Sequence, residues 1–375
     1  MTKSKATILK ADGLKSAGHR HPNDHQDFSI EPPHLFCKVR LEKQDAMTSY
    51  IILTHADKGL IFAKDLTGKL KLSIGTAYEM SLFLPGRKQT FSFRISYIQG
   101  SFFTIYPLSE NKKRQKDIGQ FLFNTLPHMT PEKIRRAGFS LYNIKQGVKT
   151  SMVKGPHDLE KVADLRHLAY QQKYKKQGIK AHLEPTDAYD ERSKIIIITH
   201  FDRVIASLRF IQNTSGDISE HEAFQAYPKM LPDKNNVIEI TRVCTHPEYR
   251  RCGLLAALFI EASKQSILDH REYLLGSSTG KLLDLYKGMG FKTTGLKYRH
   301  KTLGDMEHEV FYGKKNDLIT GNGVSPIVWH KLYSEAFYLA ASMGYPFSFS
   351  FKSYLKLLSY RCLHRFLELK KLFSP

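Results

Sequence analysis

Hydrophobic residues follow two different rhythms along this chain of 375 residues. Between residues 33 and 108 they alternate with polar residues in short, aromatic-rich runs that are separated by glycine and proline turns. From residue 155 onward, apolar runs of strand length alternate with longer segments whose apolar residues recur every three or four positions. The pattern therefore predicts a small antiparallel β-barrel followed by an α/β domain.

The expected strands of the first part are residues 49–54, 59–65, 78–85, 90–99 and 101–108. In the second part we expect strands at 194–200, 203–212, 237–245, 272–278 and 308–315, and helices at 158–178, 253–269 and 281–290. These elements divide the chain into a flexible tail (1–30), a β-barrel (31–110), a basic helical linker (111–152), a mixed α/β domain (153–316) and a C-terminal helical, basic amphipathic extension (317–375).

The chain is strongly basic, with 57 Lys and Arg against 36 Asp and Glu and a formal charge of +21. Such a surface favours nucleic acid, anionic lipid or an acidic protein as a partner. Because no segment resembles a nucleic-acid reading element, we expect no nucleic-acid partner. The histidines His19, His21 and His25 lie in the polar tail, where histidines commonly occur without a metal, so we expect no metal.

The four cysteines form no CxxC pair, which argues against a disulfide scaffold or a zinc ribbon and fits a reducing cytosol. The N-terminal residues lack the apolar core of a signal peptide, and no apolar run reaches the ~18 residues of a spanning helix. We therefore expect a soluble, cytoplasmic protein or one that sits on a membrane surface.

The most informative stretch is the strand 237–245 with the turn and helix that follow it. The turn contains Arg250, Arg251 and Gly253 and leads directly into an apolar helix. The first N–H groups of a helix have no partner inside the helix, and the helix dipole favours negative charge there. Gly253 lets the backbone approach closely and the two arginines add positive charge. A pyrophosphate or a phosphopantetheine arm is the expected guest of this turn.

This turn resembles the signature Arg/Gln-x-x-Gly-x-Gly/Ala of the GNAT superfamily of N-acyltransferases. The matching residues run from Arg250 to Leu255, where Leu255 departs from the small residue of the family. Downstream, Tyr286, Gly290 and Phe291 match the Tyr-x-x-x-Gly-Phe pattern of the same superfamily. The resemblance implies that Val243, Thr245, Arg250, Arg251, Gly253 and Leu254 border the thioester arm.

A narrower resemblance is to the N-acyl amino acid synthases and the acyl-homoserine lactone synthases. Those families carry an arginine on the first helix, an Asp-x-x-Asp, an arginine on the strand after the hairpin, and a Glu-x-Ser/Thr-Arg strand. The matching residues are Arg166, Asp187, Asp190, Arg209, Glu239, Thr241 and Arg242. The resemblance covers about residues 155 to 315 and implies an enzyme that acylates the amine of an amino acid or similar small molecule.

The chemistry of such a reaction assigns roles to these residues. An amine that attacks a thioester must lose a proton, and Glu239 is the expected base, directly or through a water molecule. Tyr286 resembles the general acid of the superfamily, and a backbone N–H near Val243 to Thr245 is the expected oxyanion donor. Strand alternation places Arg242 on the face opposite Glu239, unless a bulge turns it back toward the cleft. Arg209 or Arg242 is then expected to hold the carboxylate of an amino acid acceptor.

Structural alternatives remain open for the same residues. Glu239 and Arg242 are also consistent with a structural ion pair, Tyr286 with a core position, and Asp187 and Asp190 with a capped loop. Cys244 and Cys252 are expected to be small buried residues rather than nucleophiles.

Two donors fit the turn, acyl-coenzyme A and the phosphopantetheine of an acyl carrier protein. Carrier proteins are acidic, so the basic chain and the Leu255 departure favour a long-chain acyl carrier protein. The alternatives are an acetyltransferase that uses acetyl-coenzyme A, and a nucleotide-responsive signalling protein with a non-catalytic transferase-like domain.

The C-terminal residues 346–375 contain six Lys or Arg and one acid, Glu368. Apolar residues at helical spacing along this segment are Leu355, Leu358, Cys362, Phe366 and Leu369. A basic amphipathic helix of this kind either lies in a membrane interface or packs on the catalytic domain, and both interpretations stay open.

The barrel resembles the PilZ fold, which often binds cyclic di-GMP through an Arg-x-x-x-Arg pair and an Asp/Asn-x-Ser-x-x-Gly loop. The corresponding loop is Thr54 to Gly59, in which only the glycine matches, and no Arg-x-x-x-Arg precedes the barrel. We therefore expect a structural or docking barrel that does not bind cyclic di-GMP.

Overall fold

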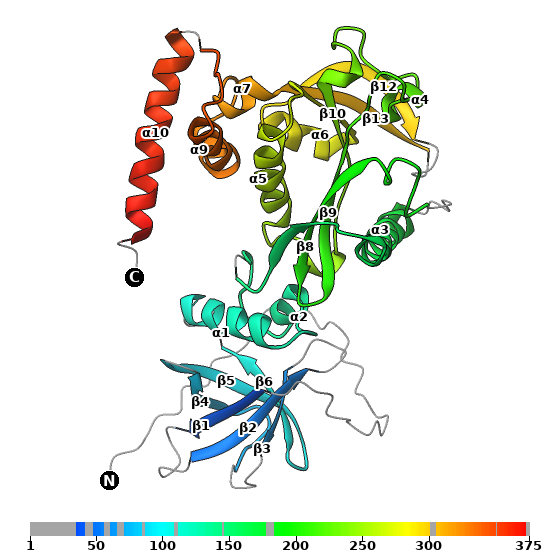
Figure 1. The fold of residues 1–375 in the computed structure, drawn as a ribbon. Coiled ribbons are helices and arrows are strands. Elements are labelled where there is room, and N and C mark those ends of the chain that lie inside the picture. The colour runs from blue at the N-terminus through cyan, green and yellow to red at the C-terminus, as the bar shows by residue number, and fades with distance from the viewer. Residues whose placement is uncertain are drawn as a thin grey trace.

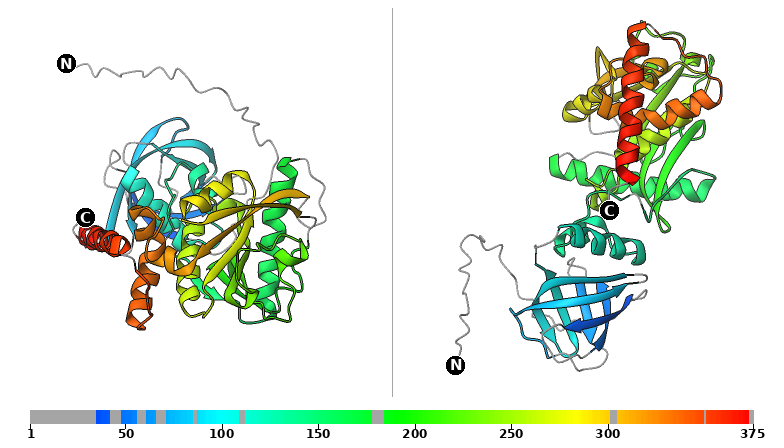
Figure 2. Two further views of the ribbon diagram at one scale, coloured as in Figure 1. Left: turned by 90° about the horizontal axis from the view of Figure 1, so that it is seen from above. Right: turned by 90° about the vertical axis from the view of Figure 1, so that its left-hand side faces the viewer.

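The computed structural model describes residues 35–41, 48–55, 61–65, 71–84, 87–108, 112–144, 146–177, 184–300, 305–349 and 351–372. The predicted tail with its three histidines and most of the loop 54–59 lie outside these residues. In Figure 1 a β-rich unit lies at one end, two short helices follow it, and the larger α/β unit occupies the other end. The same order along the long axis is visible from the side in Figure 2.

Six antiparallel strands form the N-terminal unit. They are β1 (Leu35–Leu41), β2 (Thr48–His55), β3 (Ile61–Asp65), β4 (Ala77–Leu84), β5 (Arg87–Gln99) and β6 (Phe102–Pro107). The strand order is β1-β2-β3-β6-β5-β4, and β1 also pairs with β4, so the sheet closes on itself. Five of these strands were expected from alternation, and β1 is an addition.

The linker forms α1 (Lys112–Thr125) and α2 (Pro131–Arg136). Ile118, Leu122 and Phe123 of α1 and Ile134 of α2 are buried in one apolar cluster that also contains Phe93 of the barrel. The same cluster extends to the sheet and helices of the α/β unit. The linker is therefore a packed part of the fold rather than a spacer between independent units.

The α/β unit is built on a seven-stranded sheet of order β12-β13-β11-β10-β9-β8-β7. Its strands are β7 (Lys149–Met152), β8 (Ser193–His200), β9 (Arg203–Ile211), β10 (Val237–Thr245), β11 (Tyr273–Ser278), β12 (Lys292–His300) and β13 (Met306–Lys314). Only the pair β10–β11 is parallel. All expected strands and helices of this part are present, and β7 and β12 were not predicted.

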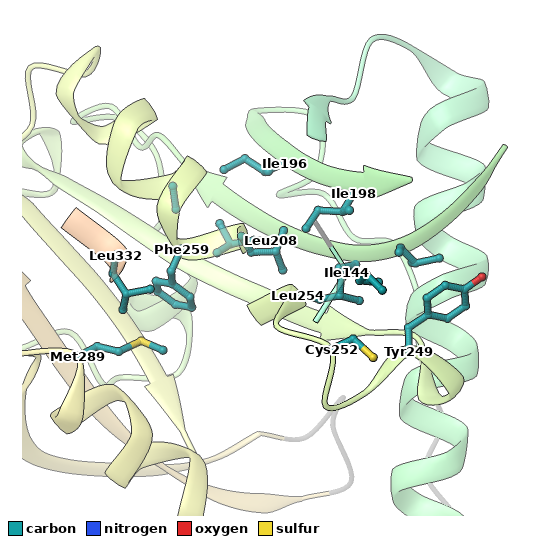
Figure 3. Packing of buried hydrophobic residues seen from close by; sticks show 14 of the residues in the cluster. Ile144, Ile196, Ile198, Leu208, Tyr249, Cys252, Leu254, Phe259, Met289 and Leu332 are labelled. Atoms are coloured by element: carbon teal, nitrogen blue, oxygen red, sulfur yellow. The ribbon is translucent and has the colours of Figure 1, made fainter. Parts of the chain in front are cut away.

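Helices cover both faces of this sheet. The helices are α3 (Pro156–Gln177), α4 (Glu220–Ala223), α5 (Leu254–Ile267), α6 (Gly280–Gly288), α7 (Lys315–Ile319), α8 (Pro326–Val328), the π-helical turn η4 (Trp329–Tyr333), α9 (Ser334–Ser342) and α10 (Phe351–Leu372), with short 3-10 turns η1 (Lys234–Asn236) and η2 (Pro247–Tyr249). On one face, Leu254 and Phe259 of α5 lie against Ile196, Ile198 and Leu208 of the sheet (Figure 3). Helix α3 packs on the other face against Ile195, Ile197 and Val204.

The middle of the sheet is irregular in two ways. Residues Val237–Ile240 of β10 pair with Tyr273–Gly276 of β11, and beyond this point β10 pairs only with β9 as far as Thr245. The β9–β10 register shifts between Thr241 and Cys244, and Arg242 has a φ of 52°. A bulge of this kind re-aims a side chain. The two parallel strands therefore part at Ile240 and Gly276, and a bulge, which the sequence left open, lies at Arg242.

Candidate active site

Two fully buried arginines form the centre of a charge network on the α3 face of the sheet. Arg166 of α3 binds both oxygens of Asp190, at 2.7 and 3.0 Å. Arg209 of β9 donates to Thr241 Oγ1 at 2.8 Å, to Glu220 at 3.0 Å and to Asp190 at 3.0 Å. It also donates to Asp187. Residues from α3, β9, β10, α4 and the loop before β8 are thereby brought to one place.

The bulge brings Arg242 into the same network. Its Nη2 donates to Asp187 Oδ2 at 2.8 Å and its Nη1 to the carbonyl of Glu184 at 3.2 Å. The arginine that strand alternation would place on the opposite face therefore joins the cluster. Glu239 is not its ion-pair partner, so the alternative of a Glu239–Arg242 pair is wrong.

The network holds two of its carboxylates, Glu220 and Asp190, in the charged form. Burial alone would raise the pKa of Glu220, but the hydrogen bond from His300 and the charges of Arg209 and Arg242 outweigh it and lower the pKa below its ordinary value. Burial of Asp190 is likewise outweighed by Arg166 and Arg209, so the pKa of Asp190 is lowered. Three arginines and three carboxylates thus share one site in which each charge has a partner.

Arg166, Arg209 and Asp190, which the narrower resemblance assigns to the site, are bound to one another in this structure. Arg166 and Arg209 are 0% exposed, and the donors of Arg209 are taken by protein groups. Asp190 accepts from both arginines. In this state these residues hold the loop 184–190, β9 and β10 together. Asp187, with 17% of its side chain exposed, is the most accessible acid of the network.

Glu239 is completely buried and already has its partners. Its Oε1 accepts from Asn213 Nδ2 at 2.8 Å, and its Oε2 lies 2.8 Å from His221 Nδ1 and 3.3 Å from the backbone nitrogen of His221. Burial alone would lower the pKa of His221, but the charge and hydrogen bond of Glu239 outweigh it and raise the pKa. Direct contact between Glu239 and an amine is therefore excluded in this state.

A group of polar side chains continues from His221 toward the edge strands. The ring of His221 lies edge-on to Tyr298 of β12, with centroids 6.1 Å apart. The hydroxyl of Tyr298 lies 2.7 Å from that of Ser277, which follows Gly276 on β11. His308 of β13 lies 3.4 Å from the same Ser277 hydroxyl. These groups lie just beyond the last paired residues of β10 and β11.

Tyr286 of α6 is buried and stacks on Phe311, with ring centroids 4.4 Å apart. Burial, and then the nearby Tyr170, raise the pKa of its hydroxyl. Tyr170 belongs to α3 on the opposite face, where its ring lies 5.9 Å from the guanidinium carbon of Arg242. Two tyrosines from opposite faces therefore approach each other near the parted strands. Tyr286 is both a core residue and a candidate proton donor.

The turn that precedes α5 contains two residues with positive φ. Arg251 has φ 65° and Gly253, the N-cap of α5, has φ 79° with no side-chain hydrogen bond to the first helical N–H groups. Arg251 and Gly253 are exposed, while Leu254 is buried in the core. The first turn of α5 therefore has no side-chain cap, and an anion at this helix end stays a prediction.

Residues that precede the α/β unit make hydrogen bonds to this turn. Arg135 of α2 donates to the carbonyls of Leu141 at 2.8 Å and Arg250 at 3.3 Å. The backbone nitrogen of Ile144 donates to the carbonyl of Cys252 at 3.3 Å. Cys252 is buried there and Cys244 is buried beneath α3, which agrees with their expected packing role. Val243 and Thr245 lie half-buried on β10 beyond the bulge.

Sequence reasoning missed four residues of this site: His221, Glu220, Asn213 and Tyr170. Ser219 and Glu222 form a reciprocal capping box that begins α4, a pattern that the sequence shows. That pattern predicts a helix start, but not that the helix places Glu220 and His221 against Arg209 and Glu239. A separate group near the C-terminus, His330, His364 and Glu368, is the one set in the described residues whose donor atoms are close enough to hold a metal.

A family model described as "Acetyltransferase (GNAT) domain" matches residues 165–259. A search of curated proteins found no match. Among solved structures, the chain is similar to FeeM, an N-acyl amino acid synthase from uncultured soil microbes. The two chains are 13% identical, the match covers 51% of this chain and 97% of FeeM, and the TM-score is 0.36. The chain is also similar to MesI, a CoA-dependent acyl-homoserine lactone synthase, with 12% identity, coverage of 54% and 97%, and a TM-score of 0.34.

A third similar structure is a Bacillus subtilis acetyltransferase in complex with CoA, with 12% identity, coverage of 44% and 98%, and a TM-score of 0.29. These similarities are too distant to assign a substrate. The matched family model does not extend into the barrel, so the PilZ resemblance is not confirmed. Residues 165–259 form part of a GNAT domain, and this assignment rests on the family model.

Proposed function

Starting from the GNAT domain, we propose that the protein is an N-acyltransferase that moves a long-chain acyl group from a thioester to the amine of an amino acid or a similar small amine. The observation that carries the proposal is the arrangement at the parted strands. The Glu239–His221 pair lies beside Ile240 and Gly276, where β10 and β11 part. The N-terminus of α5, which has no side-chain cap, follows the C-terminal end of β10.

We place the donor between the parted strands and the N-terminus of α5. Its phosphate would lie at the first N–H groups of α5 beside Arg250 and Arg251, and its thioester would reach back toward Gly276. A backbone N–H near Val243 to Thr245 is the proposed oxyanion donor. Tyr286 is the proposed source of the proton for the departing thiolate, because its raised pKa keeps the hydroxyl protonated.

We propose an acyl carrier protein as the preferred donor and acyl-coenzyme A as the alternative. A chain with a formal charge of +21 attracts an acidic carrier, and Leu255 stands where the family signature has a small residue. A competition assay tests this choice. Robust turnover with short acyl-coenzyme A and none with the loaded carrier would show that the donor is wrong and would favour the second candidate, an acetyltransferase.

Asp187 and Arg242 are the proposed contacts for the acceptor, since Asp187 is the most accessible acid of the network. The remaining charged residues then orient this pair. A replacement of Asp187 by Asn is expected to raise KM for the amine and to leave KM for the donor nearly unchanged. An equal rise in both KM values would contradict this role.

The overall proposal is tested by the release of free thiol from an acyl thioester in the presence of amines, followed by mass spectrometry of the product. The N-acyl product names donor and acceptor together. Glu239→Gln is expected to lower kcat by roughly 100-fold or more, because it removes the charge of the Glu239–His221 pair that is to supply the general base. A wild-type protein that releases no thiol from any donor with any amine would exclude the enzyme.

We also propose that the enzyme attaches to the anionic inner face of the cytoplasmic membrane through α10. Leu357 and Tyr360 are buried on one side of this helix. The opposite side shows Phe351, Leu355, Leu358, Phe366 and Leu369, each between 46% and 79% exposed. Arg361 and Arg365 follow by helical spacing along one border of this stripe, as expected for a helix that lies in a lipid interface. Figure 1 shows α10 along the outside of the fold.

None of the helices in the described part of the chain combines the length and hydropathy needed to cross a bilayer. Attachment is tested with full-length protein and vesicles that contain phosphatidylglycerol. The double variant Leu358→Glu/Phe366→Glu is expected to lose binding, whereas Ile327→Glu, at an exposed apolar position outside α10, is expected to keep it. Equal binding by all three proteins would contradict the proposal.

A further inference from the structure

We propose that His221, rather than Glu239, accepts the proton from the attacking amine, with Glu239 holding the imidazole in place. This inference rests on the proposed acyl transfer and names the base of that reaction. It assigns to α4 a catalytic residue that the sequence motifs of the family do not include.

The first argument is the occupancy of Glu239. Glu239 and His221 are both buried, with side chains 0% and 1% exposed, so their hydrogen bonds separate them. Both oxygens of Glu239 are engaged by Asn213 Nδ2 and by the backbone and ring nitrogens of His221, whereas Nε2 of His221 is not engaged. An amine could reach this carboxylate only after these hydrogen bonds break and a buried charge loses its partners. Such a step is costly in a site with so little contact with water.

The second argument is the direction of the imidazole. With Nδ1 turned to Glu239, the ring presents Nε2 to the other side, and Nε2 is buried without a partner that meets hydrogen-bond geometry. The carbonyl of Gly276 lies close enough to favour a proton on the ring. Because Gly276 is the last residue of β11 that pairs with β10, Nε2 lies at the point where the two strands part. This is where the thioester carbonyl is expected.

The third argument is the charge around the ring. The titratable groups that face His221 are Glu239 of β10, Glu220 of α4 itself and Tyr298 of β12, which in turn contacts His308 of β13. Burial lowers the pKa of the ring, and the two carboxylates outweigh this effect and raise it above the ordinary 6.5. A carboxylate that orients an imidazole and stabilises its protonated form is the arrangement by which enzymes make histidine an effective base.

The step balances as follows. The amine nitrogen attacks the thioester carbonyl, a C–N bond forms, and the proton of the amine moves to Nε2 of neutral His221. The C–S bond then breaks, and the thiolate takes a proton from the hydroxyl of Tyr286. The proton on His221 is then passed to the tyrosinate, directly or by exchange through solvent, so the enzyme is regenerated and an amine and a thioester give an amide and a thiol. Glu239 keeps its hydrogen bond to Nδ1–H throughout.

The pH profile provides the sharpest test because a structural role would not shape it. Neutral His221 is required, so kcat of the wild type is expected to rise with pH through a pKa above 6.5 and then level off. Glu239→Gln removes the charge that raises this pKa, so its ascending limb is expected at lower pH. A wild-type kcat that does not rise in this range would overturn the inference without any variant.

The variant His221→Gln is expected to lose 100-fold to 10,000-fold in kcat, to keep the KM for the donor and to lack the ascending limb. His157→Gln, at an exposed histidine of α3, is the matched control and is expected to keep wild-type kcat. If His221→Gln folds poorly in a thermal melt, His221→Asn replaces it.

Activity of His221→Gln within threefold of the wild type would overturn the inference and leave the acyltransferase function intact. The inference would also be overturned if the rise of kcat with pH disappeared in Glu239→Gln and remained in His221→Gln, because Glu239 would then be the base. A wild type that is inactive with every donor would refute the function itself, so the two failures are distinguishable.

Discussion

Replacement of Arg209 by Met tests the buried charge network most directly. Arg209 is 0% exposed and is the residue that Asp187, Asp190 and Glu220 share. Met is close in length, so the change removes the charge and the hydrogen bonds while much of the volume is kept. Asp187 retains Arg242 and Asp190 retains Arg166, whereas Glu220 loses its arginine partner and is left beside His300, whose Nε2 lies 3.6 Å away.

Removal of one member of a buried ion pair costs about 3–5 kcal/mol, because the remaining charge stays buried without compensation. A domain of 150–250 residues loses roughly 2–4 °C in Tm for each kcal/mol, so the expected fall in Tm is roughly 6–20 °C. The measurement is urea unfolding followed by circular dichroism at neutral pH, together with a thermal melt. Glu220→Gln in the Arg209→Met background is expected to recover part of the loss, since it removes the charge left uncompensated.

Arg192→Met is the matched control. Arg192 pairs with Asp217 at 2.6 Å, but their side chains are 29% and 28% exposed, so the expected cost is below about 1 kcal/mol. Equal losses of stability in Arg209→Met and Arg192→Met would refute the reasoning, because burial of the network would then contribute nothing.

Three further expectations concern acid, packing and the linker. Because its pKa is lowered on folding, Glu220 contributes stability that is present above its ordinary pKa of 4.5 and is lost as pH falls through the lowered value; Glu220→Gln should flatten the dependence of unfolding free energy on pH below 4.5. Gly276→Ala should lower the free energy of unfolding in urea by about 1–3 kcal/mol, since the added Cβ would lie 2.7 Å from the Phe311 ring. In Gly288→Ala the added Cβ meets open space, so no such loss is expected. Arg135→Ala should raise the donor KM several-fold by loosening the turn at Arg250, and an unchanged donor KM would contradict this coupling.

The sequence predicted the order of strands and helices in the α/β unit because their apolar periodicity reports burial on a sheet or a helix face. It also predicted that Arg166, Asp187, Asp190, Arg209 and Arg242 belong to one site. Their positions in the sequence do not reveal which charges neutralise one another. That information depends on how closely three segments approach one another in space, namely α3, β10 and the loop that precedes β8.

The Glu239–His221 pair shows where sequence reasoning ends. The four-residue helix α4 has too few residues for a periodicity signal, and Ser219 and Glu222 mark only its start. The contact between His221 and Glu239 joins residues 18 positions apart that lie on different elements. The strands β7 and β12 escaped prediction for a related reason, since both lie at the edges of the sheet and alternate only weakly between buried and exposed positions.

The contacts of Arg135 and Ile144 with the turn before α5 have a consequence for how this chain can be divided. A fragment that begins at β7 would retain every charged residue of the buried network, yet it would leave Cys252 uncovered and the carbonyl of Arg250 without its guanidinium donor. The turn before α5 is supported by residues that precede the domain to which it belongs. Experiments on the isolated C-terminal half would therefore measure a turn that differs from the one in the intact chain, and with it a different proposed donor site.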